Sequence, residues 1–400
     1  MQRRILSRGM SRKTQAKFDI PLLIAVYGLS LFGVICIAIA TFDPDNGTDL
    51  SLLNYVVNSN SGRWQAIFVL VSMAVVAVVI AVPMDFYKRL TKLIYYAVLA
   101  LLLITLAAAT AVSGINAWLT MGAGRTLQPC EFAKLAILFM LAKELSSKEK
   151  PMGTVKDFIR TCMILGVPAV ITLLQGETGT VIVMGFMFIV MMFFAGVDNR
   201  IFFSIVGLLA LAVGLLFGYA IISQSTNYRI LRILSFMDPS KYSSSGGYQI
   251  LQSQMAIGSG GLNGIGAFVT GSVSQLDYVP EDHTDFIFSA IGEAFGFKGC
   301  CCVILVYMFI CLHMLRLAYY TGDKYSRLII VGVMGMLFLH AFENMAMTIG
   351  LMPITGIPLP FLSYGGSNYM TNIVGVALVL NATRSRSAAN DLINGHFKVQ

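Results

Sequence analysis

Long apolar segments recur along this chain of 400 residues, and they constrain its fold more than any other feature. Hydrophobic residues make up 56% of the sequence and charged residues only 12%, about half the charged share of a soluble domain. A soluble protein of this size could not bury so much apolar surface. The composition excludes a disordered chain, a disulfide-stapled secreted domain and an ordinary cytosolic enzyme. It predicts an all-α polytopic membrane protein.

A helix that crosses a membrane needs about 20 mostly apolar residues. Ten segments meet or nearly meet this requirement, so the sequence predicts about ten transmembrane helices. Pro168 is expected to break the fifth, and Gly292, Gly296 and Gly299 predict a tilt or kink in the eighth. The predicted spans are 20–41, 66–84, 93–112, 129–146, 158–174, 178–197, 201–222, 285–315, 328–350 and 363–382.

The placement of basic residues predicts the orientation of the chain. The net charge of +8 comes mostly from loops on the side that also holds both termini. Because cytoplasmic loops carry an excess of Lys and Arg, both termini are expected in the cytoplasm. Membrane lipid is then the natural surrounding and nucleic acid is not expected as a partner. Most of the seven cysteines lie in apolar runs and are interpreted as small buried hydrophobes.

The chain is expected to form a single membrane domain over 1–400, with a basic cytoplasmic N-terminus at 1–19 and a cytoplasmic tail at 383–400. A loop of about 60 residues, 223–284, separates spans seven and eight on the outer side. Its aromatic content does not suit disorder. We expect this extracellular loop to be structured and to fold over the outer face of the bundle.

Two ionisable residues stand near the start of span 129–146, where Pro129 suits the first helical turn. Glu131 and Lys134 are three residues apart and therefore share a helix face. Ionisable groups inside a membrane are costly and face the protein interior or a polar cavity. The pair is interpreted either as an internal ion pair that fixes packing or as the lining of an outward-facing cavity. The two interpretations are compatible.

A cluster of polar ionisable residues lies where the long loop meets span 285–315. Thr284 or Asp285 could cap that helix, but capping does not account for the whole cluster. A carboxylate beside a low-dielectric wall has a raised pKa, which suits a general base, and Asp285 is expected in this position. The cluster consists of Glu281, Asp282, His283, Thr284 and Asp285.

The loop also contains a run rich in glycine and serine, 258–266. Its GxGxxG-like spacing carries no weight, because no strand precedes it. The run is interpreted either as backbone that presents N–H groups to phosphate oxygens or as a tightly packed turn. Arg229 and Arg232 could bind the same anionic ligand, on the basis of their charge and loop position. Glu293 is expected to be a structural hydrogen-bonding group.

Prolines and glycines interrupt the chain at 344–367, between the last two spans. Non-helical backbone near membrane depth is tolerated only where it is buried in protein or lines a cavity. We therefore expect this segment to shape the mouth of the site, with Ser363, Gly365 and Gly366 among its lining residues.

These stretches make the sequence recognisable. On Gln128–Lys134 (QPCEFAK), on the stretch from Tyr248 to Gly299 with its His-Thr-Asp-Phe core, and on 344–367, the chain resembles the SEDS family (shape, elongation, division and sporulation). The resemblance covers essentially all ten predicted spans. The residues of the third stretch are more similar to the rod-shape branch of the family than to the division branch.

The resemblance implies a peptidoglycan glycosyltransferase that polymerises lipid II into glycan strands at the outer leaflet, together with a class B penicillin-binding protein. It carries the essential aspartate of the family over to Asp285 and the cavity pair to Glu131 and Lys134. Asp285 would deprotonate the acceptor hydroxyl, or orient it through Mg²⁺ or Mn²⁺, for inverting attack on the donor. Lys134, Arg229 or Arg232 would stabilise the leaving charge. No organic cofactor is expected.

The chain departs from the family pattern at Ala117, at Cys130 and at Gly176-Glu177. Two other classes of function remain to be distinguished from the enzyme. A lipid II transporter should show paired broken helices or repeats near the midplane, which the sequence lacks. A non-catalytic scaffold for a penicillin-binding protein predicts that Asp285 is dispensable.

Overall fold

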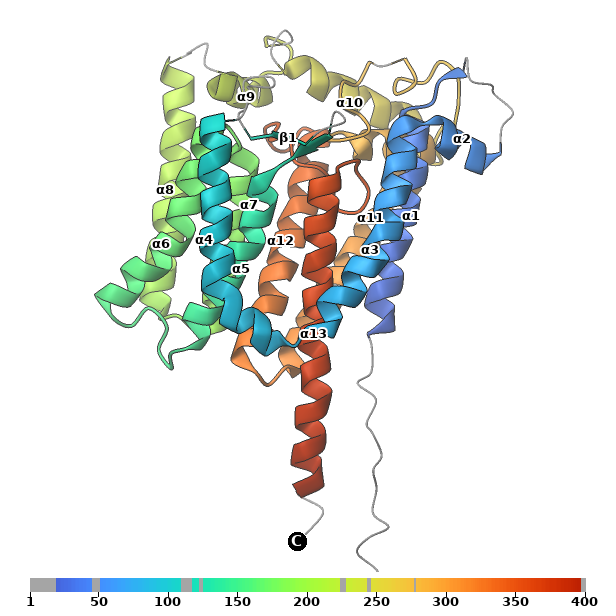
Figure 1. Cartoon of the computed structure of the whole chain (residues 1–400). Coiled ribbons are helices and arrows are strands. Elements are labelled where there is room, and N and C mark those ends of the chain that lie inside the picture. The colour runs from blue at the N-terminus through green and yellow to red at the C-terminus, as the bar shows by residue number, and fades with distance from the viewer. Residues whose placement is uncertain are drawn as a thin grey trace, which may run out of the picture.

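Long helices run side by side in a bundle, and shorter elements cover one of its ends (Figure 1). We call the covered end the loop end and the opposite one, beyond which the last helix extends, the tail end. The computed structural model describes residues 19–44, 51–108, 117–121, 125–223, 228–242, 246–276 and 278–396.

Each of the ten predicted spans overlaps one long helix. These helices are α1 (Ile20–Ala40), α3 (Asn60–Ala81), α4 (Met84–Ala108), α5 (Pro129–Ser146), α6 (Val155–Gln175), α7 (Thr178–Ala195), α8 (Asn199–Ser223), α11 (Ile287–Tyr320), α12 (Lys324–Thr348) and α13 (Gly366–His396). The elements that cover the loop end are α2 (Leu52–Asn58), α9 (Tyr228–Met237), α10 (Gly247–Gly260) and an antiparallel pair of strands, β1 (Leu119–Met121) and β2 (Arg125–Leu127).

Eight of the described helices are long and apolar enough to cross a membrane: α1, α3, α4, α6, α7, α8, α11 and α12. The prediction of an all-α polytopic membrane protein is thereby confirmed. The charged residues of α5 and the polar second half of α13 keep these two helices outside that class, although both run within the bundle (Figure 1). The count of ten spans stays a prediction.

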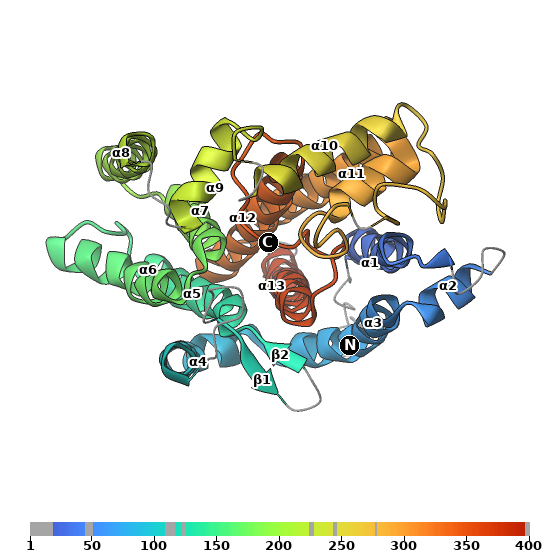
Figure 2. The ribbon, with the colours of Figure 1, turned by 90° about the horizontal axis from the view of Figure 1, so that it is seen from above.

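The core lies along α12, which is surrounded by other helices, and along the neighbouring α13 (Figure 2). Nearly all of the α5 side chains are buried as well. By contrast, α8 stands at the edge of the bundle and exposes its leucines and phenylalanines almost along its whole length. Apolar side chains exposed in this way are stable against lipid tails but not against water.

Two expectations about helix breaks have different outcomes. Pro168 was expected to break its span, but α6 continues through it to Gln175, so that expectation is wrong. Neighbouring helices can make up for the hydrogen bond that a proline removes. Gly296 does interrupt α11, with φ +65° and ψ −164°, as the glycine pattern predicted. Only glycine adopts this backbone conformation readily.

The glycine-rich run docks onto α11 at this interruption. The backbone N–H of Ile265 donates to the carbonyl of Glu293 over 2.9 Å, and the N–H of Phe297 donates to the carbonyl of Gly261 over 2.9 Å. A side chain on Gly260 or Gly264 would collide with the α11 backbone. The run is therefore a tightly packed turn rather than an open cradle for phosphate.

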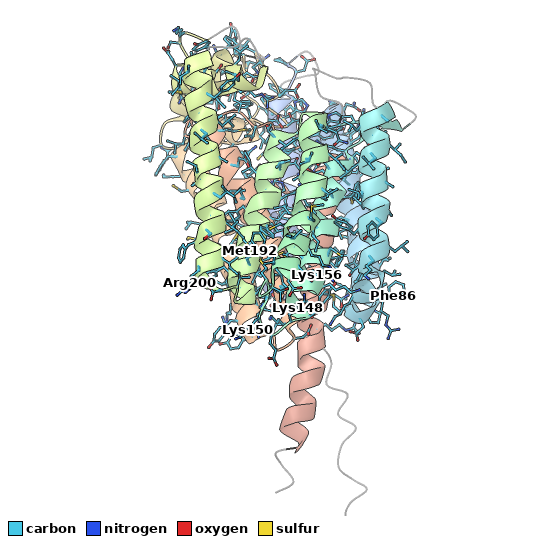
Figure 3. All side chains as sticks on the ribbon, turned by 90° about the vertical axis from the view of Figure 1, so that its left-hand side faces the viewer. Phe86, Lys148, Lys150, Lys156, Met192 and Arg200 are labelled. Carbon is cyan, nitrogen blue, oxygen red and sulfur yellow. The ribbon has the colours of Figure 1, made fainter. Side chains whose placement is uncertain are left out.

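Basic side chains gather at the tail end, where Lys148, Lys150, Lys156 and Arg200 are labelled in Figure 3. Lys148 forms ion pairs with Glu144 and Asp157, and Arg160 pairs with Glu144 over 3.2 Å. These pairs tie the end of α5 to the start of α6.

Candidate active site

Asp285 lies at the loop end, two residues before α11 begins. A Cβ atom placed on Gly356 would lie 3.4 Å from Asp285 Oδ2 and 3.9 Å from an Arg232 guanidinium nitrogen. The carboxylate and the guanidinium thus both lie beside the bare backbone of Gly356, which has φ +72°. Asn344 holds this arrangement, because its Nδ2 donates to the carbonyls of Asp285 and Ile357, each over 2.7 Å.

The surroundings of Asp285 suit proton transfer near neutral pH. Burial raises the pKa of its carboxyl group to about 6, and the negative charge of Glu281 adds to this effect. The positive charges of Arg232 and His283 act in the opposite direction. A carboxylate with such a pKa is ionised at neutral pH and still binds a proton well, as a general base must.

The other members of the predicted cluster surround Asp285. The Thr284 hydroxyl donates to the Glu281 carbonyl over 3.1 Å and to the Glu281 carboxylate over 3.0 Å. His283 contacts Asp282 over 3.4 Å, and this hydrogen bond raises the pKa of the imidazole. Phe286 is the N-cap residue of α11 and makes no side-chain cap, so neither Thr284 nor Asp285 caps the helix. We call Asp285, Arg232, Glu281 and His283 the upper layer.

A second group of charges lies deeper in the bundle. Lys134 Nζ donates to Glu131 Oε2 over 2.8 Å and lies 2.8 Å from His340 Nε2, while Asn368 Nδ2 donates to the same Glu131 oxygen over 3.1 Å. Lys134 is 0% exposed and Glu131 is 2% exposed. The pair is therefore an internal ion pair, as one of the two interpretations of the sequence predicted.

Two residues of this deeper group were not predicted as site residues. His340 and Glu343 stand three apart on α12 and face the Glu131–Lys134 pair on α5. Both are fully buried. Within the described part of the chain, His340 Nδ1 makes no hydrogen bond, and the Glu343 carboxylate lies near the Thr355 hydroxyl and the Lys134 ammonium. We call Glu131, Lys134, His340 and Glu343 the lower layer.

Glu177 lies between the two layers, where the charges of Glu131 and Asp285 both act on it. Gln128 Nε2 donates to Glu177 Oε1 over 2.7 Å, and the backbone N–H of Gln128 donates to Ser367 Oγ over 3.2 Å. Burial raises the pKa of Glu177 to about 7, the hydrogen bond from Gln128 opposes this rise, and the charges of Glu131 and Asp285 add to it. Glu177 lies between two predicted spans. The criterion that marks ionisable residues inside a span as functional therefore could not identify it from the sequence.

The segment between α12 and α13 is non-helical over 351–359, as predicted. Ser363 Oγ accepts from the backbone N–H of Leu359 over 2.8 Å and therefore closes a turn. Gly366 packs against the ring of Phe68, and Gly365 packs near Asn368. These three predicted residues shape the segment that carries Gly356, rather than joining the charged groups themselves.

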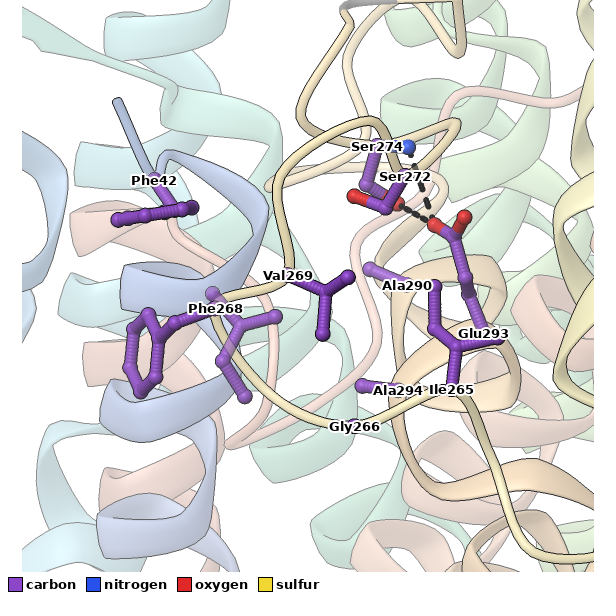
Figure 4. Close-up of a pocket in the computed structure, with 11 residues that line it drawn as sticks. Phe42, Ile265, Gly266, Phe268, Val269, Ser272, Ser274, Ala290, Glu293 and Ala294 are labelled. Carbon is purple, nitrogen blue, oxygen red and sulfur yellow. Dashed lines mark hydrogen bonds between the residues drawn. The ribbon is translucent and has the colours of Figure 1, made fainter. Parts of the chain in front are cut away.

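Glu293 is a structural hydrogen-bonding group, as predicted. Its carboxylate accepts from the backbone N–H of Val273 over 2.6 Å. It also accepts from the backbone N–H of Ser274 over 3.0 Å and from the Ser274 hydroxyl over 2.6 Å (Figure 4). The contacts fix the loop of 271–276 to α11. The side chain of Arg229 lies outside the described part of the structure.

The described residues do not include a preformed cluster of metal ligands. Among the residues that the structure describes, no three His, Cys, Asp or Glu side chains converge as metal ligands. Lys134 and Arg232 instead place fixed positive charge beside the carboxylates.

Comparison with known proteins places the chain in a family. The family model described as cell cycle protein (FtsW/RodA/SpoVE) matches residues 21–388. This chain belongs to the FtsW/RodA/SpoVE family, and the resemblance to SEDS proteins is confirmed. It is a multi-pass membrane protein.

Two curated relatives are similar over most of their length. The probable peptidoglycan glycosyltransferase FtsW of Geobacter sp. (strain M18) is 35% identical over 69% of this chain and 73% of its own. The peptidoglycan glycosyltransferase MrdB of Escherichia coli (strain K12) is 30% identical over 77% of this chain and 82% of its own.

The same fold occurs in a solved structure, "Structural coordination of polymerization and crosslinking by a peptidoglycan synthase complex". One of its chains superposes with a TM-score of 0.75 and 26% identity. The match covers 92% of this chain and 98% of that chain.

Proposed function

We propose that this enzyme polymerises lipid II into glycan strands at the outer face of the bacterial cytoplasmic membrane, with Asp285 as general base. Membership of the family and relatives named peptidoglycan glycosyltransferases support the class of reaction. The observation that carries the residue assignment is that Asp285 and Arg232 both lie beside the bare backbone of Gly356, where the charge of Arg232 acts on the Asp285 carboxylate.

The reaction needs one proton acceptor and one cation. The acceptor sugar hydroxyl attacks the anomeric carbon of the donor, its proton passes to Asp285, and the bond from that carbon to the lipid-linked diphosphate breaks with inversion. Arg232 stabilises the negative charge on the departing diphosphate. Lys134, held inside the bundle by Glu131 and His340, adds a positive charge in the lower layer.

We further propose that the chain works with a class B penicillin-binding protein and serves cell elongation. The solved complex that couples polymerisation to crosslinking supports the first point by analogy. The amino-acid sequence of 347–361 supports the rod-shape role. The relatives do not separate the two roles, because they include both FtsW and MrdB. A divalent cation, Mg²⁺ or Mn²⁺, at Asp285 also stays a proposal, and chelation with EDTA in the assay below tests it.

The test is polymerisation by purified protein with a penicillin-binding partner and labelled lipid II. Wild type should give glycan ladders, and Asp285→Asn should give none while keeping its elution profile and helicity. Ladders made by Asp285→Asn would refute the assignment of the base. If wild type gives no ladders but moves lipid II across liposomes, the chain is a transporter; if ladders form equally well with Asp285→Asn, it is a scaffold.

A further inference from the structure

Glu177 stands between the two layers of the site, and the mechanism above gives it no part. Gly176 ends α6 in a left-handed conformation, with φ +102°, and Glu177 precedes the first turn of α7. The side chain is 7% exposed, and Gln128 is its hydrogen-bond donor. No ion pair joins Glu177 to a lysine or arginine among the described residues.

The start of α7 places Glu177 beside the backbone that carries Asp285 and Arg232. A Cβ on Gly179 would lie 2.6 Å from the Ile357 side chain and 3.0 Å from the Thr355 Cβ. Thr355 and Ile357 flank Gly356, and the side chains of Asp285 and Arg232 both lie beside the Gly356 backbone. The first turn of α7 is thus packed against the turn that forms the floor of the upper layer.

We propose that Glu177 takes up a proton when the diphosphate group of lipid II binds, so that a neutral carboxyl group faces the bound anion. The inference rests on the proposed function, because it requires an anionic lipid-linked substrate in this site.

The charges that face Glu177 explain why a proton is needed. From α5 it faces the carboxylate of Glu131 and the thiol of Cys130, from α9 the guanidinium of Arg232, and from the residues before α11 the carboxylate of Asp285. The Lys134 ammonium is already paired with Glu131. With Lys134 and Glu131 paired, the carboxylates of Glu177 and Asp285 both face the guanidinium of Arg232 before any substrate arrives.

Glu177, rather than Asp285, is the group that takes the proton. Burial raises the pKa of both carboxyl groups, but Asp285 faces the positive charges of both Arg232 and His283, which favour its ionised form, whereas Glu177 faces that of Arg232. Near neutral pH a bound anion therefore protonates Glu177 first and leaves Asp285 ionised for catalysis. A Glu177 carboxyl group that is neutral can also donate a hydrogen bond to a phosphate oxygen.

The experiment measures KM and kcat for lipid II polymerisation by the full-length protein with its partner, from about pH 5.5 to about pH 9. Above pH 7 the wild-type KM should rise about tenfold per pH unit, because ligand binding then requires one proton from solution. Glu177→Gln keeps the shape, the contact with Gln128 and a neutral donor. Its KM should stay flat over this range.

The matched control is Glu149→Gln, which removes an exposed carboxylate from the tail end and should keep the wild-type KM profile. A Glu177→Gln protein whose KM rises with pH as in wild type would overturn the inference. Absence of ladders from wild type at every pH would instead sink the proposed function.

A binding measurement gives a readout that does not depend on turnover. Calorimetry of lipid II binding to Asp285→Asn, in two buffers of different ionisation enthalpy, should show proton uptake near pH 7.5. The Asp285→Asn/Glu177→Gln protein should bind with no uptake. Equal uptake by both proteins would also overturn the inference.

Discussion

At the scale of single residues, Asp285 is suited to catalysis and poorly suited to stability. Burial raises its pKa from the ordinary 3.8 to about 6, so the folded protein binds this proton more tightly than the unfolded chain does. Between about pH 4 and pH 6 the unfolded chain loses the proton first, and the free energy of unfolding falls as pH rises. At neutral pH the ionised group therefore destabilises the fold.

The Asp285→Asn protein is accordingly expected to be inactive and yet more stable than wild type near pH 7.5. A shift of two pKa units corresponds to at most about 3 kcal/mol, and partial exposure of the side chain reduces this to about 1 kcal/mol. Thermal unfolding in detergent should show a higher Tm for Asp285→Asn near pH 7.5 and equal values near pH 4. A lower Tm for the variant near pH 7.5 would contradict the stated environment of Asp285.

The buried Lys134 should behave in the opposite way. Lys134→Met leaves Glu131 with an uncompensated buried charge and should lower the free energy of unfolding by about 3–5 kcal/mol. Lys134→Met/Glu131→Gln should recover most of this loss. The control is Lys148→Met, whose ion pairs are partly exposed and should contribute less than about 1 kcal/mol. Denaturant unfolding of the three proteins measures the difference, and equal losses for Lys134→Met and Lys148→Met would refute the buried pair.

What the sequence reveals about the site depends on where each residue falls. Glu131 and Lys134 could be predicted because they lie inside an apolar span. His340 and Glu343 satisfy the same rule within span 328–350 and could have been predicted from it. Glu177 could not, because it stands between spans, where charged residues are common. Its importance depends on burial by α5 and by the turn of 353–358, which only the tertiary structure provides.

At the scale of elements, apolar length predicts that a helix exists but not where it begins. Span 66–84 corresponds to a helix that starts at Asn60, because the Ser59 hydroxyl accepts from the backbone N–H of Gly62. Span 93–112 corresponds to α4, which starts at Met84 and includes two charged turns that hydropathy leaves out. Helices α9 and α10 are too short or too polar to be found by the same criterion.

The interruption of α11 is the element-scale feature with the clearest consequence. Gly296→Ala places a Cβ against the backbone of Asn263 and Gly264 and forces alanine to φ +65°. The variant should lose about 3 kcal/mol or more of unfolding free energy and detach the glycine-rich run from α11. Gly207→Ala in α8, where a Cβ meets nothing within 4 Å, is the control and should change stability by less than about 1 kcal/mol.

Hydrogen exchange of the backbone amides reports the detachment directly. Loss of protection at Ile265 and Gly266 is expected in Gly296→Ala and not in Gly207→Ala, because these two N–H groups donate to α11 carbonyls. Unchanged protection at both amides would mean that the run does not depend on the α11 interruption.

At the scale of the whole molecule, charge and architecture indicate one orientation in the membrane. The tail end carries the basic cluster of Lys148, Lys150, Lys156 and Arg200 (Figure 3). The site lies at the loop end, because Arg232 belongs to α9 and Asp285 precedes α11 (Figure 1). Because short cytoplasmic loops retain Lys and Arg, the tail end should face the cytoplasm and the site should face outward. A polymerase of lipid II at the outer leaflet requires this arrangement, and a reversed chain would place Asp285 on the wrong side of its substrate.

Cysteine labelling in intact cells tests the orientation. Leu276→Cys is exposed at the loop end and Lys150→Cys is exposed at the tail end, so each presents a reachable thiol. A membrane-impermeant maleimide should label Leu276→Cys in intact spheroplasts and should label Lys150→Cys only after permeabilisation. The wild-type chain, whose cysteines lie within the bundle or against lipid, gives the background. The reverse pattern would invert the topology, and a site facing the cytoplasm could not extend strands outside the cell.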